Sequence, residues 1–242
     1  MTPSLSIVVP MHNESGNAAA LIRDIASACA AISHEILAVD DASTDDTLKE
    51  LTALKAPENP EVPQLRILSH ASNAGQSRAV RSGVLAARAP VIATLDGDGQ
   101  NPPANIPTLY AHLRDTGVAL VGGERQKRQD SRAKLLASRI GNAVRKRLLH
   151  DDANDTGCGL KVFERDAFLR LPYFDHIHRY LPALMLREGY RTAFLPVTHR
   201  AREHGVSKYT NLGRLKVSLA DLRGVRWLNS RARLPGEVRE IE

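Results

Sequence analysis

The chain has 242 residues, of which 43% are hydrophobic and 4% aromatic, and its formal net charge is +6. This length and apolar content can bury the core of one main domain, while two cysteines, Cys29 and Cys158, are too few for a disulfide framework. No apolar stretch reaches the roughly 18 to 20 residues that a membrane-spanning helix needs, and no signal peptide is expected, so the composition favours a cytoplasmic protein.

Up to residue 122 the chain alternates short β-rich runs with helical patterns. The runs predict strands at 5–9, 35–39, 66–69, 91–95 and 118–122, and the patterns between them predict helices at 15–31, 44–54, 74–87 and 103–113. This alternation is typical of βαβ units, so we expect an α/β fold with a mostly parallel sheet covered by helices.

After Gly123 the pattern changes to long amphipathic helices with basic faces. From Arg132 one helix is expected, with an apolar line at Leu136, Ile140, Val144 and Leu148. A second is expected at 212–228, with Trp227 as an interfacial anchor and an apolar side at Leu212, Leu215, Leu219, Leu222 and Val225. Such helices could lie on a membrane or carry arginines toward a phosphate, although an ordinary solvated basic face is the alternative for any single arginine.

The charges are distributed unevenly along the chain. Residues 1–124 hold 8 Lys and Arg against 14 Asp and Glu, whereas residues 125–150 hold 9 against 1 and residues 199–233 hold 9 against 2. An acidic half joined to a basic half suits a metal-dependent site beside a surface that receives an anion or an anionic membrane. Nucleic-acid binding is the weaker alternative, because aromatic residues are few and no nucleic-acid reading motif is present.

Three polar clusters follow three of the expected strands. They lie in SIVVPMHNE (6–14), LAVDDASTDDT (37–47) and VIATLDGDGQNPP (91–103). Because the carboxyl ends of parallel strands meet at one edge of a sheet, these clusters should share a ligand-binding crevice. A fourth run, NAGQSRAVRSG (73–83), adds a glycine-containing loop that leads into a helix.

The DGDGQ turn is a candidate metal site. Asp96 and Asp98, helped by Gln100, offer hard oxygen ligands to Mg2+ or Mn2+, which keep positions open for phosphate oxygens. A D-x-D alone fits a polar turn equally well. An EF-hand start is excluded, because its sixth position would be Asn101 rather than Gly and its twelfth Pro107 rather than Glu.

The motifs PMHNE, VDDASTDDT, NAGQSRAVRSG and DGDGQNPP resemble those of inverting family 2 glycosyltransferases with a GT-A fold. The runs VGGERQKRQDS (121–131), DTGCGLKVF (155–163), HRYLPAL (178–184) and RAREHGVSKY (200–209) resemble the polyprenol-phosphate glycosyltransferases, which include dolichol-phosphate mannosyltransferase and undecaprenyl-phosphate sugar transferases. The resemblance implies a Rossmann-like three-layer GT-A domain over 1–210, with a nucleotide- and metal-binding half (1–124) and an acceptor half (125–210). It leaves 211–242 as a membrane-proximal basic amphipathic helix with a polar tail.

The resemblance also implies roles for individual residues. The nucleotide and donor site would be formed by Pro10, His12, Asn13, Glu14, Val39, Asp41, Gly75 and Asp96. The metal and diphosphate would be held by Asp96, Asp98 and Gln100, and the acceptor phosphate by Arg125 and Arg139. Basic residues that close over both phosphates would be Arg202 and Lys208, while Asp155 would lie beside the transfer site and His178 with Arg179 would shape the sugar pocket.

The implied reaction agrees with elementary chemistry. A divalent cation would neutralise the departing diphosphate, and a lipid phosphate is already anionic, so arginines that position it matter more than a general base. Asp155 is therefore interpreted as an orienting or electrostatic residue, with Asp98, Arg125, Arg139 and Arg202 as the other catalytic candidates. The HRYLPAL run favours GDP-mannose, which is the donor we expect. The alternative, which the RQKRQDS run favours, is a UDP-sugar used on undecaprenyl phosphate in envelope or lipid A modification.

Other readings remain open. A transferase of the same fold could act on a soluble or polysaccharide acceptor, and a non-catalytic membrane-associated scaffold is the alternative from another class, although intact carboxylates argue against it. Many relatives add hydrophobic helices after the SKY segment, whereas this sequence continues into RARLPGEVREIE. We therefore expect a peripheral enzyme on the inner membrane face, held by its basic helices or by a separate small membrane protein.

Overall fold

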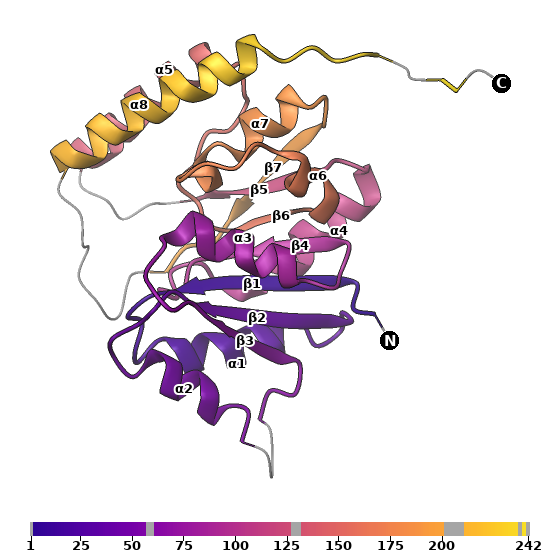
Figure 1. Ribbon diagram of the computed structural model, residues 1–242, viewed down its shortest axis with the longest axis vertical. Helices are drawn as coiled ribbons and strands as arrows, with labels where there is room; N and C mark the ends of the chain where they lie inside the picture. The colour runs from indigo at the N-terminus through magenta and orange to yellow at the C-terminus, as the bar shows by residue number, and fades with distance from the viewer. Residues whose placement is uncertain (1, 57–60, 127–131, 201–210, 237–238, 241–242) are drawn as a thin grey trace.

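The computed structural model describes residues 2–56, 61–126, 132–200, 211–236 and 239–240, with only the backbone for 132–140 and 211–216. Within these ranges one sheet runs in the order β3-β2-β1-β4-β6-β5-β7 (Figure 1). Its strands are β1 Leu5–Met11, β2 His34–Asp40, β3 Leu65–Ser69, β4 Val91–Thr94, β5 Leu120–Arg125, β6 Lys161–Glu164 and β7 Thr192–Val197. All neighbouring pairs are parallel except those of β6, which is antiparallel to β4 and to β5.

Helices cover both faces of the sheet and make a three-layer sandwich. They are α1 Ala18–Ala28, α2 Thr47–Ala53, α3 Gln76–Ala86, α4 Ile106–Thr116, α5 Arg132–Leu149, α6 Arg165–Arg170, α7 Leu181–Arg187 and α8 Asn211–Ser230, with short 3-10 turns at Pro103–Asn105 and Ile177–Arg179. The predicted α/β fold with a mostly parallel sheet is therefore confirmed, and every strand and helix expected before residue 123 has a counterpart.

Each face of the sheet has its own hydrophobic core. In β1, Ile7 and Val9 belong to the core that α1 and α4 cover, whereas Val8 points to the core under α3, α6 and α7. Side chains alternate between the faces of a strand, so strands buried on both sides appear in the sequence as continuous apolar runs. A Cβ added at Gly83 would lie 2.4 Å from Val8, so α3 packs directly on the sheet only because that position is glycine.

Four elements of the second half lack clear sequence signals: the strands β6 and β7 and the helices α6 and α7. β6 has only two apolar residues between Lys161 and Glu164, and β7 is a half-buried edge strand that contains Pro196. Proline is tolerated at a sheet edge because no neighbour needs its missing N–H. Both strands are therefore defined by tertiary pairing more than by local pattern.

α5 and α8 lie side by side at the end of the molecule beyond β7 (Figure 1). Val225 of α8 is buried, and Leu222 and Leu228 pack against the same core. Leu219 is 47% exposed, so this part of the predicted apolar side of α8 is not covered by the core that Leu222 and Val225 contact. No helix in the described ranges combines the length and apolar character needed to cross a bilayer.

Candidate functional site

The polar runs that follow β1 and β2 interlock at one edge of the sheet. The Asn13 amide donates to Ser43 Oγ at 2.9 Å, and Asn13 Oδ1 accepts from the Thr44 amide at 2.7 Å. The Glu14 amide donates to Thr47 Oγ1 at 2.9 Å. Asn13 has φ 56, a left-handed conformation that asparagine tolerates better than most residues. These bonds also explain why α1 and α2 start a few residues later than the sequence predicted.

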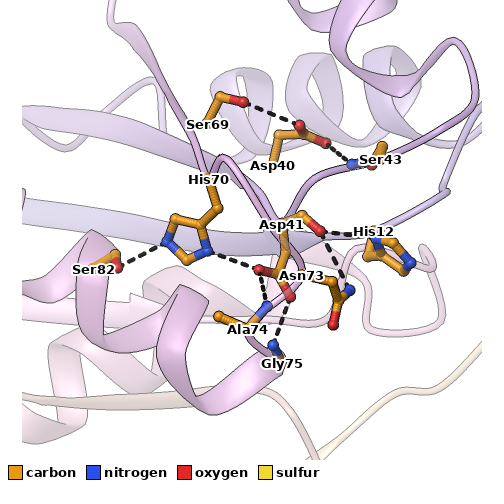
Figure 2. Close-up of polar contacts among 10 residues, drawn as sticks. All are labelled: His12, Asp40, Asp41, Ser43, Ser69, His70, Asn73, Ala74, Gly75 and Ser82. Carbon is orange, nitrogen blue, oxygen red and sulfur yellow. Dashed lines mark hydrogen bonds and ion pairs between the residues drawn. The ribbon is translucent and has the colours of Figure 1, made fainter.

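The carboxylate of Asp41 holds the loop that leads into α3 (Figure 2). Its oxygens accept from the backbone amides of Ala74 at 2.9 Å and Gly75 at 2.8 Å, and from His70 Nδ1 at 2.7 Å. Gly75 has φ 85, which strains any residue with a side chain. An ionised carboxylate has roughly four acceptor positions, so Asp41 retains about one for a further hydrogen bond.

His12 and Val39 occupy different environments beside this loop. His12 Nδ1 donates to the backbone oxygen of Asp41 at 2.9 Å, so its ring lies at the rim of the predicted nucleotide site (Figure 2). The Val39 side chain is fully buried in the core under α3. Only the backbone atoms of Val39 therefore remain candidates for the predicted contact with the nucleotide.

Asp96 and Asp98 follow β4 at the same edge. Asp96 Oδ1 accepts from Gln76 Nε2 at 2.7 Å, and Asp98 Oδ1 accepts from the Gln100 amide at 3.2 Å. Burial and the adjacent Asp98 raise the pKa of Asp96, against the opposing pull of Lys161 and Arg125. A Cβ at Gly159 would lie 2.3 Å from the Asp96 carboxylate, so only glycine fits there.

These carboxylates suit a divalent cation. Two acidic groups crowded into one turn, with a raised pKa at Asp96, are the arrangement that a bound cation would relieve. Among the described residues no group of three or more His, Cys, Asp or Glu is placed to hold a metal. Mg2+ commonly binds through one or two carboxylates together with water and substrate phosphates, so a site of this kind fits it.

Lys161 is a buried cation that the sequence analysis did not single out. It begins β6 and pairs in register with Thr94 and Gly122, because an antiparallel strand brings its amino end to this edge. Its Nζ donates to the backbone oxygen of Cys158, and burial lowers its pKa. The signal that could have identified it is a lysine directly before the apolar pair Val162 and Phe163 of a short strand.

Lys161 lines a small cavity beneath the acidic turn. The lining includes Pro10, Gln76, Asp96, Lys161, His178 and Leu181. His178 Nδ1 bonds to Ser77 Oγ at 2.7 Å, and burial together with nearby cations holds the pKa of His178 well below its usual value. The imidazole is therefore neutral at physiological pH. The structure thus brings the predicted Pro10, Asp96 and His178 together.

Arg125 and Asp155 form a bidentate ion pair at the end of β5. Arg125 Nε lies 2.7 Å from Asp155 Oδ2 and Nη2 lies 2.8 Å from Oδ1. Burial would lower the pKa of Arg125, but Asp155 outweighs it and the pKa is raised. Arg125 also contributes to the pKa of Asp96, so the pair belongs to the same site. Both Asp155 oxygens are engaged, which agrees with an orienting group better than with a base.

The remaining predicted residues are placed less completely. Arg139 belongs to α5, but its side chain lies outside the described atoms, and Arg202 and Lys208 fall in 201–210, outside the described residues. The Arg200 amide donates to the Gln100 backbone oxygen at 2.9 Å. Arg200, the last described residue before 201–210, therefore lies beside the acidic turn. Arg179 lies in the 3-10 turn Ile177–Arg179, next to His178.

The family model described as Glycosyl transferase family 2 matches residues 6–171. The chain belongs to this family. It is 35% identical over 210 residues to the dodecaprenyl-phosphate galacturonate synthase of Rhizobium johnstonii, covering 85% of this chain and 61% of that protein. It is also 35% identical over 208 residues to an undecaprenyl-phosphate 4-deoxy-4-formamido-L-arabinose transferase of Yersinia pestis, covering 85% of this chain and 62% of that protein. The chain therefore spans about three fifths of the length of these relatives.

Solved structures share the fold of this family 2 chain. Glucosyl-3-phosphoglycerate synthase from Mycobacterium tuberculosis, in complex with Mn2+, UDP and glucosyl-3-phosphoglycerate, superposes with a TM-score of 0.69 at 19% identity over 97% of this chain and 82% of that chain. A mannosyltransferase from Pyrobaculum calidifontis, in complex with GDP-Man and Mn2+, gives a TM-score of 0.66 at 17% identity over 95% of this chain and 64% of that chain. At these identities the similarity shows the fold, and the predicted GT-A class is confirmed.

Proposed function

We propose that this chain is a metal-dependent inverting glycosyltransferase that moves a sugar from a nucleotide sugar to a polyprenyl phosphate. The observation that carries the proposal is one sheet edge where the acidic pair Asp96 and Asp98 meets the ion pair of Arg125 and Asp155. The first suits a cation with a diphosphate, and the second offers a fixed guanidinium to an anion. Both curated relatives are named for a polyprenyl phosphate, which supports the same acceptor here.

The chain's own residues supply binding and orientation. Bound Mg2+ or Mn2+ would neutralise the charge that develops on the departing diphosphate. Asp96, Asp98 and Gln100 would hold the cation, and the loops that carry Pro10, Asn13, Glu14, Asp41 and Gly75 would bind the nucleotide, with His12 at their rim. Gln76 and Gly159 fix the Asp96 carboxylate from two sides.

Arg125 would receive the acceptor phosphate while Asp155 holds the guanidinium in place. The phosphate oxygen is already ionised near neutral pH, so attack on the anomeric carbon needs alignment more than proton removal. Attack from the side opposite the leaving diphosphate inverts the configuration. Arg139, Arg202 and Lys208 remain proposed phosphate ligands on the strength of the motif resemblance.

A UDP-sugar is the preferred donor in this proposal, in place of the GDP-mannose that the HRYLPAL run favoured. The relatives are named for galacturonate and for a formamido-arabinose, and one structural neighbour holds UDP. Another neighbour holds GDP-Man, so GDP-mannose stays as a second donor to be tested. A soluble phosphorylated acceptor is the second candidate reaction, because the structural neighbour with UDP also holds a glucosyl-phosphoglycerate.

The outer side of α5 and α8 supports a location on the inner face of the membrane. Val144, Leu219 and Trp227 are each 46% exposed or more, and the exposed Arg223 and Arg226 lie among them. Apolar side chains mixed with cations are typical of helices that lie in the interface of an anionic bilayer. This surface favours direct contact with lipid over a separate small membrane protein. We therefore propose 1–210 as the catalytic unit and 211–242 as the membrane-proximal segment.

The proposed halves at 1–124 and 125–210 are functional and share one sheet. β6 of the acceptor half pairs with β4 of the donor half, so neither half has a sheet of its own. The division is therefore expected to separate binding roles, not independently folding units.

The test is incubation of the purified chain with Mg2+ or Mn2+, a panel of UDP-sugars and GDP-mannose, and a short polyprenyl phosphate in detergent. We expect a glycolipid with one donor, whose formation stops on chelation and is strongly reduced in Asp98→Ala. No glycolipid with any donor, together with unimpaired nucleotide binding by Asp98→Ala, would contradict the proposal. Transfer to glycerol phosphate or phosphoglycerate instead would support the soluble acceptor.

A further inference from the structure

The loop after α5 is fastened to one face of that helix. Asn142, Arg145 and Lys146 are spaced so that their side chains share a face, and all three reach residues of this loop. Arg145 Nη2 lies 2.9 Å from Asp151 Oδ1 and also donates to the Ala153 backbone oxygen, and both charged side chains are nearly inaccessible, at 7% and 1% exposure. This buried pair anchors the base of the loop.

Asn154, in this loop, is hydrogen-bonded both to α5 and to β5. From α5, Asn142 Nδ2 donates to the Asn154 backbone oxygen at 2.5 Å, and Lys146 Nζ donates to Asn154 Oδ1 at 2.6 Å. Toward β5, the Asn154 amide and Nδ2 both donate to Glu124 Oε1, at 3.1 and 2.7 Å. Asn154 is itself exposed, yet four hydrogen bonds to other residues hold it.

The contact between Asn154 and Glu124 lies directly beside the functional ion pair. Glu124 precedes Arg125 and Asn154 precedes Asp155, so two successive side-chain links join the end of β5 to the loop. A shift of the loop relative to β5 would therefore change how Asp155 holds Arg125. α5 itself carries Arg139, the second proposed acceptor-phosphate ligand.

We infer that Asn154 is a positioning residue that couples α5 to the Arg125 and Asp155 pair, and so sets the acceptor phosphate against the donor sugar. The inference rests on the proposed function and extends it to a residue outside the recognised motifs. Asn154 acts through Glu124 on one side and through Asn142 and Lys146 on the other. An alternative is that these bonds only complete the surface of a turn, in which case they would affect local stability and nothing else.

The first test compares Asn154→Ala with Asp152→Ala, an exposed carboxylate in the same loop. Misplacement of reacting groups by a fraction of an ångström lowers turnover, so Asn154→Ala should lower kcat for the lipid acceptor roughly tenfold. The donor KM and nucleotide affinity should change less than about twofold, because the hydrogen bonds of Asn154 to other described residues go to Asn142, Lys146 and Glu124, none of them proposed for the donor site. Asp152→Ala should behave like wild type. Equal kcat values for all three proteins would overturn the inference.

A paired substitution separates the contact from general damage to the loop. Asn154→Asp keeps the acceptor for Lys146 but sets a second carboxylate against Glu124, so it should lower kcat at least as much as Asn154→Ala. Glu124→Gln alone keeps one acceptor oxygen and should cost less than about threefold. In the double variant, the Gln side-chain amide can donate to the Asp carboxylate, and kcat should return to within about threefold of wild type. A double variant as slow as Asn154→Asp counts against the contact.

Hydrogen exchange measures the coupling without any substrate. Asn154→Ala should speed amide exchange both in residues 142–149 and in residues 123–125, while Asp152→Ala should speed neither. Faster exchange confined to the loop would overturn the inference even if the enzyme assay succeeds. If wild type makes no glycolipid, the proposed function fails, and the exchange result still decides whether Asn154 couples the two elements.

Discussion

Asp41 and Arg125 stand at equivalent places, at the carboxyl ends of the parallel strands β2 and β5, but the protein holds them differently. Two backbone amides, of Ala74 and Gly75, bind the Asp41 carboxylate together with His70 Nδ1, whereas the side chain of Asp155 binds the Arg125 guanidinium. Main-chain donors are provided by the fold itself, and side-chain partners depend on single residues. Binding of the donor around Asp41 should therefore tolerate substitutions around Arg125, which we call the acceptor side. The geometry of the acceptor side, in contrast, can be disturbed by one substitution in a loop.

The largest effect is expected on the donor side, with Asp98→Ala. Loss of one carboxylate leaves the cation and diphosphate poorly held, so kcat should fall roughly 10²- to 10³-fold, the range seen when a charge-stabilising group is removed. Metal titration of sugar transfer is the measurement, and Asp115→Ala, an exposed carboxylate on α4, is the control. Retained activity in Asp98→Ala would remove the acidic turn from the mechanism.

Gly159→Ala tests how tightly the donor side is packed. The added Cβ would lie 2.3 Å from the Asp96 carboxylate, so Asp96 must move and nucleotide affinity with metal should fall at least about tenfold. Gly224→Ala in α8 meets nothing within 4 Å and should stabilise the helix by about 0.5 to 1 kcal/mol. Calorimetric titration with UDP and Mn2+ compares the two, and equal affinity in both variants would contradict the packing argument.

Arg125→Lys tests the acceptor side. Lysine keeps the charge but loses the two parallel bonds to Asp155, so turnover on polyprenyl phosphate should fall about tenfold or more. Because the bonds that hold the donor loops, to Ser43, Thr47 and Asp41, involve neither Arg125 nor Asp155, UDP affinity should stay within about twofold of wild type. A matching loss of UDP affinity would show that the two sides are not separable in this way.

Glu35→Gln gives the smallest effect, on stability alone. Ser6, the Arg88 amide and Arg66 outweigh burial and lower the pKa of Glu35, so its ionised form stabilises the fold. This contribution is complete above the ordinary pKa of a glutamate and is lost as pH falls through the lower folded pKa. Urea unfolding should show a loss of about 1 to 3 kcal/mol at pH 7 and a smaller difference near pH 4. An equal loss at both pH values would contradict the assigned cause.

The contrast between the two sides also governs what the sequence could predict. The strands and turns around Asn13, Asp41 and Asp96 were predictable, because each polar cluster directly follows an apolar run in a βαβ unit. Lys161 was missed since β6 is short and antiparallel, and its place at the site follows from pairing with β4 and β5. No periodicity reveals such a pairing.

Side-chain contacts between segments distant in the sequence are the other feature of the site that sequence patterns could not predict. Arg125 and Asp155 were both identified by motif resemblance, but their bidentate contact depends on how the loop after α5 folds back on β5. The links of Asn154 to Glu124 and Lys146 have no motif at all. Val39 was assigned to the nucleotide site from its neighbours in a motif, yet strand alternation turns its side chain into the core.

The most direct test of the central claim compares polyprenyl phosphate with the matching polyprenol as acceptors for one nucleotide sugar. If Arg125 receives an ionised phosphate that needs no general base, wild type should glycosylate the phosphate at least about 10³-fold faster than the alcohol, and Arg125→Lys should reduce that ratio. Equal transfer to the alcohol, or transfer to neither lipid while a soluble phosphate is glycosylated, would contradict the account.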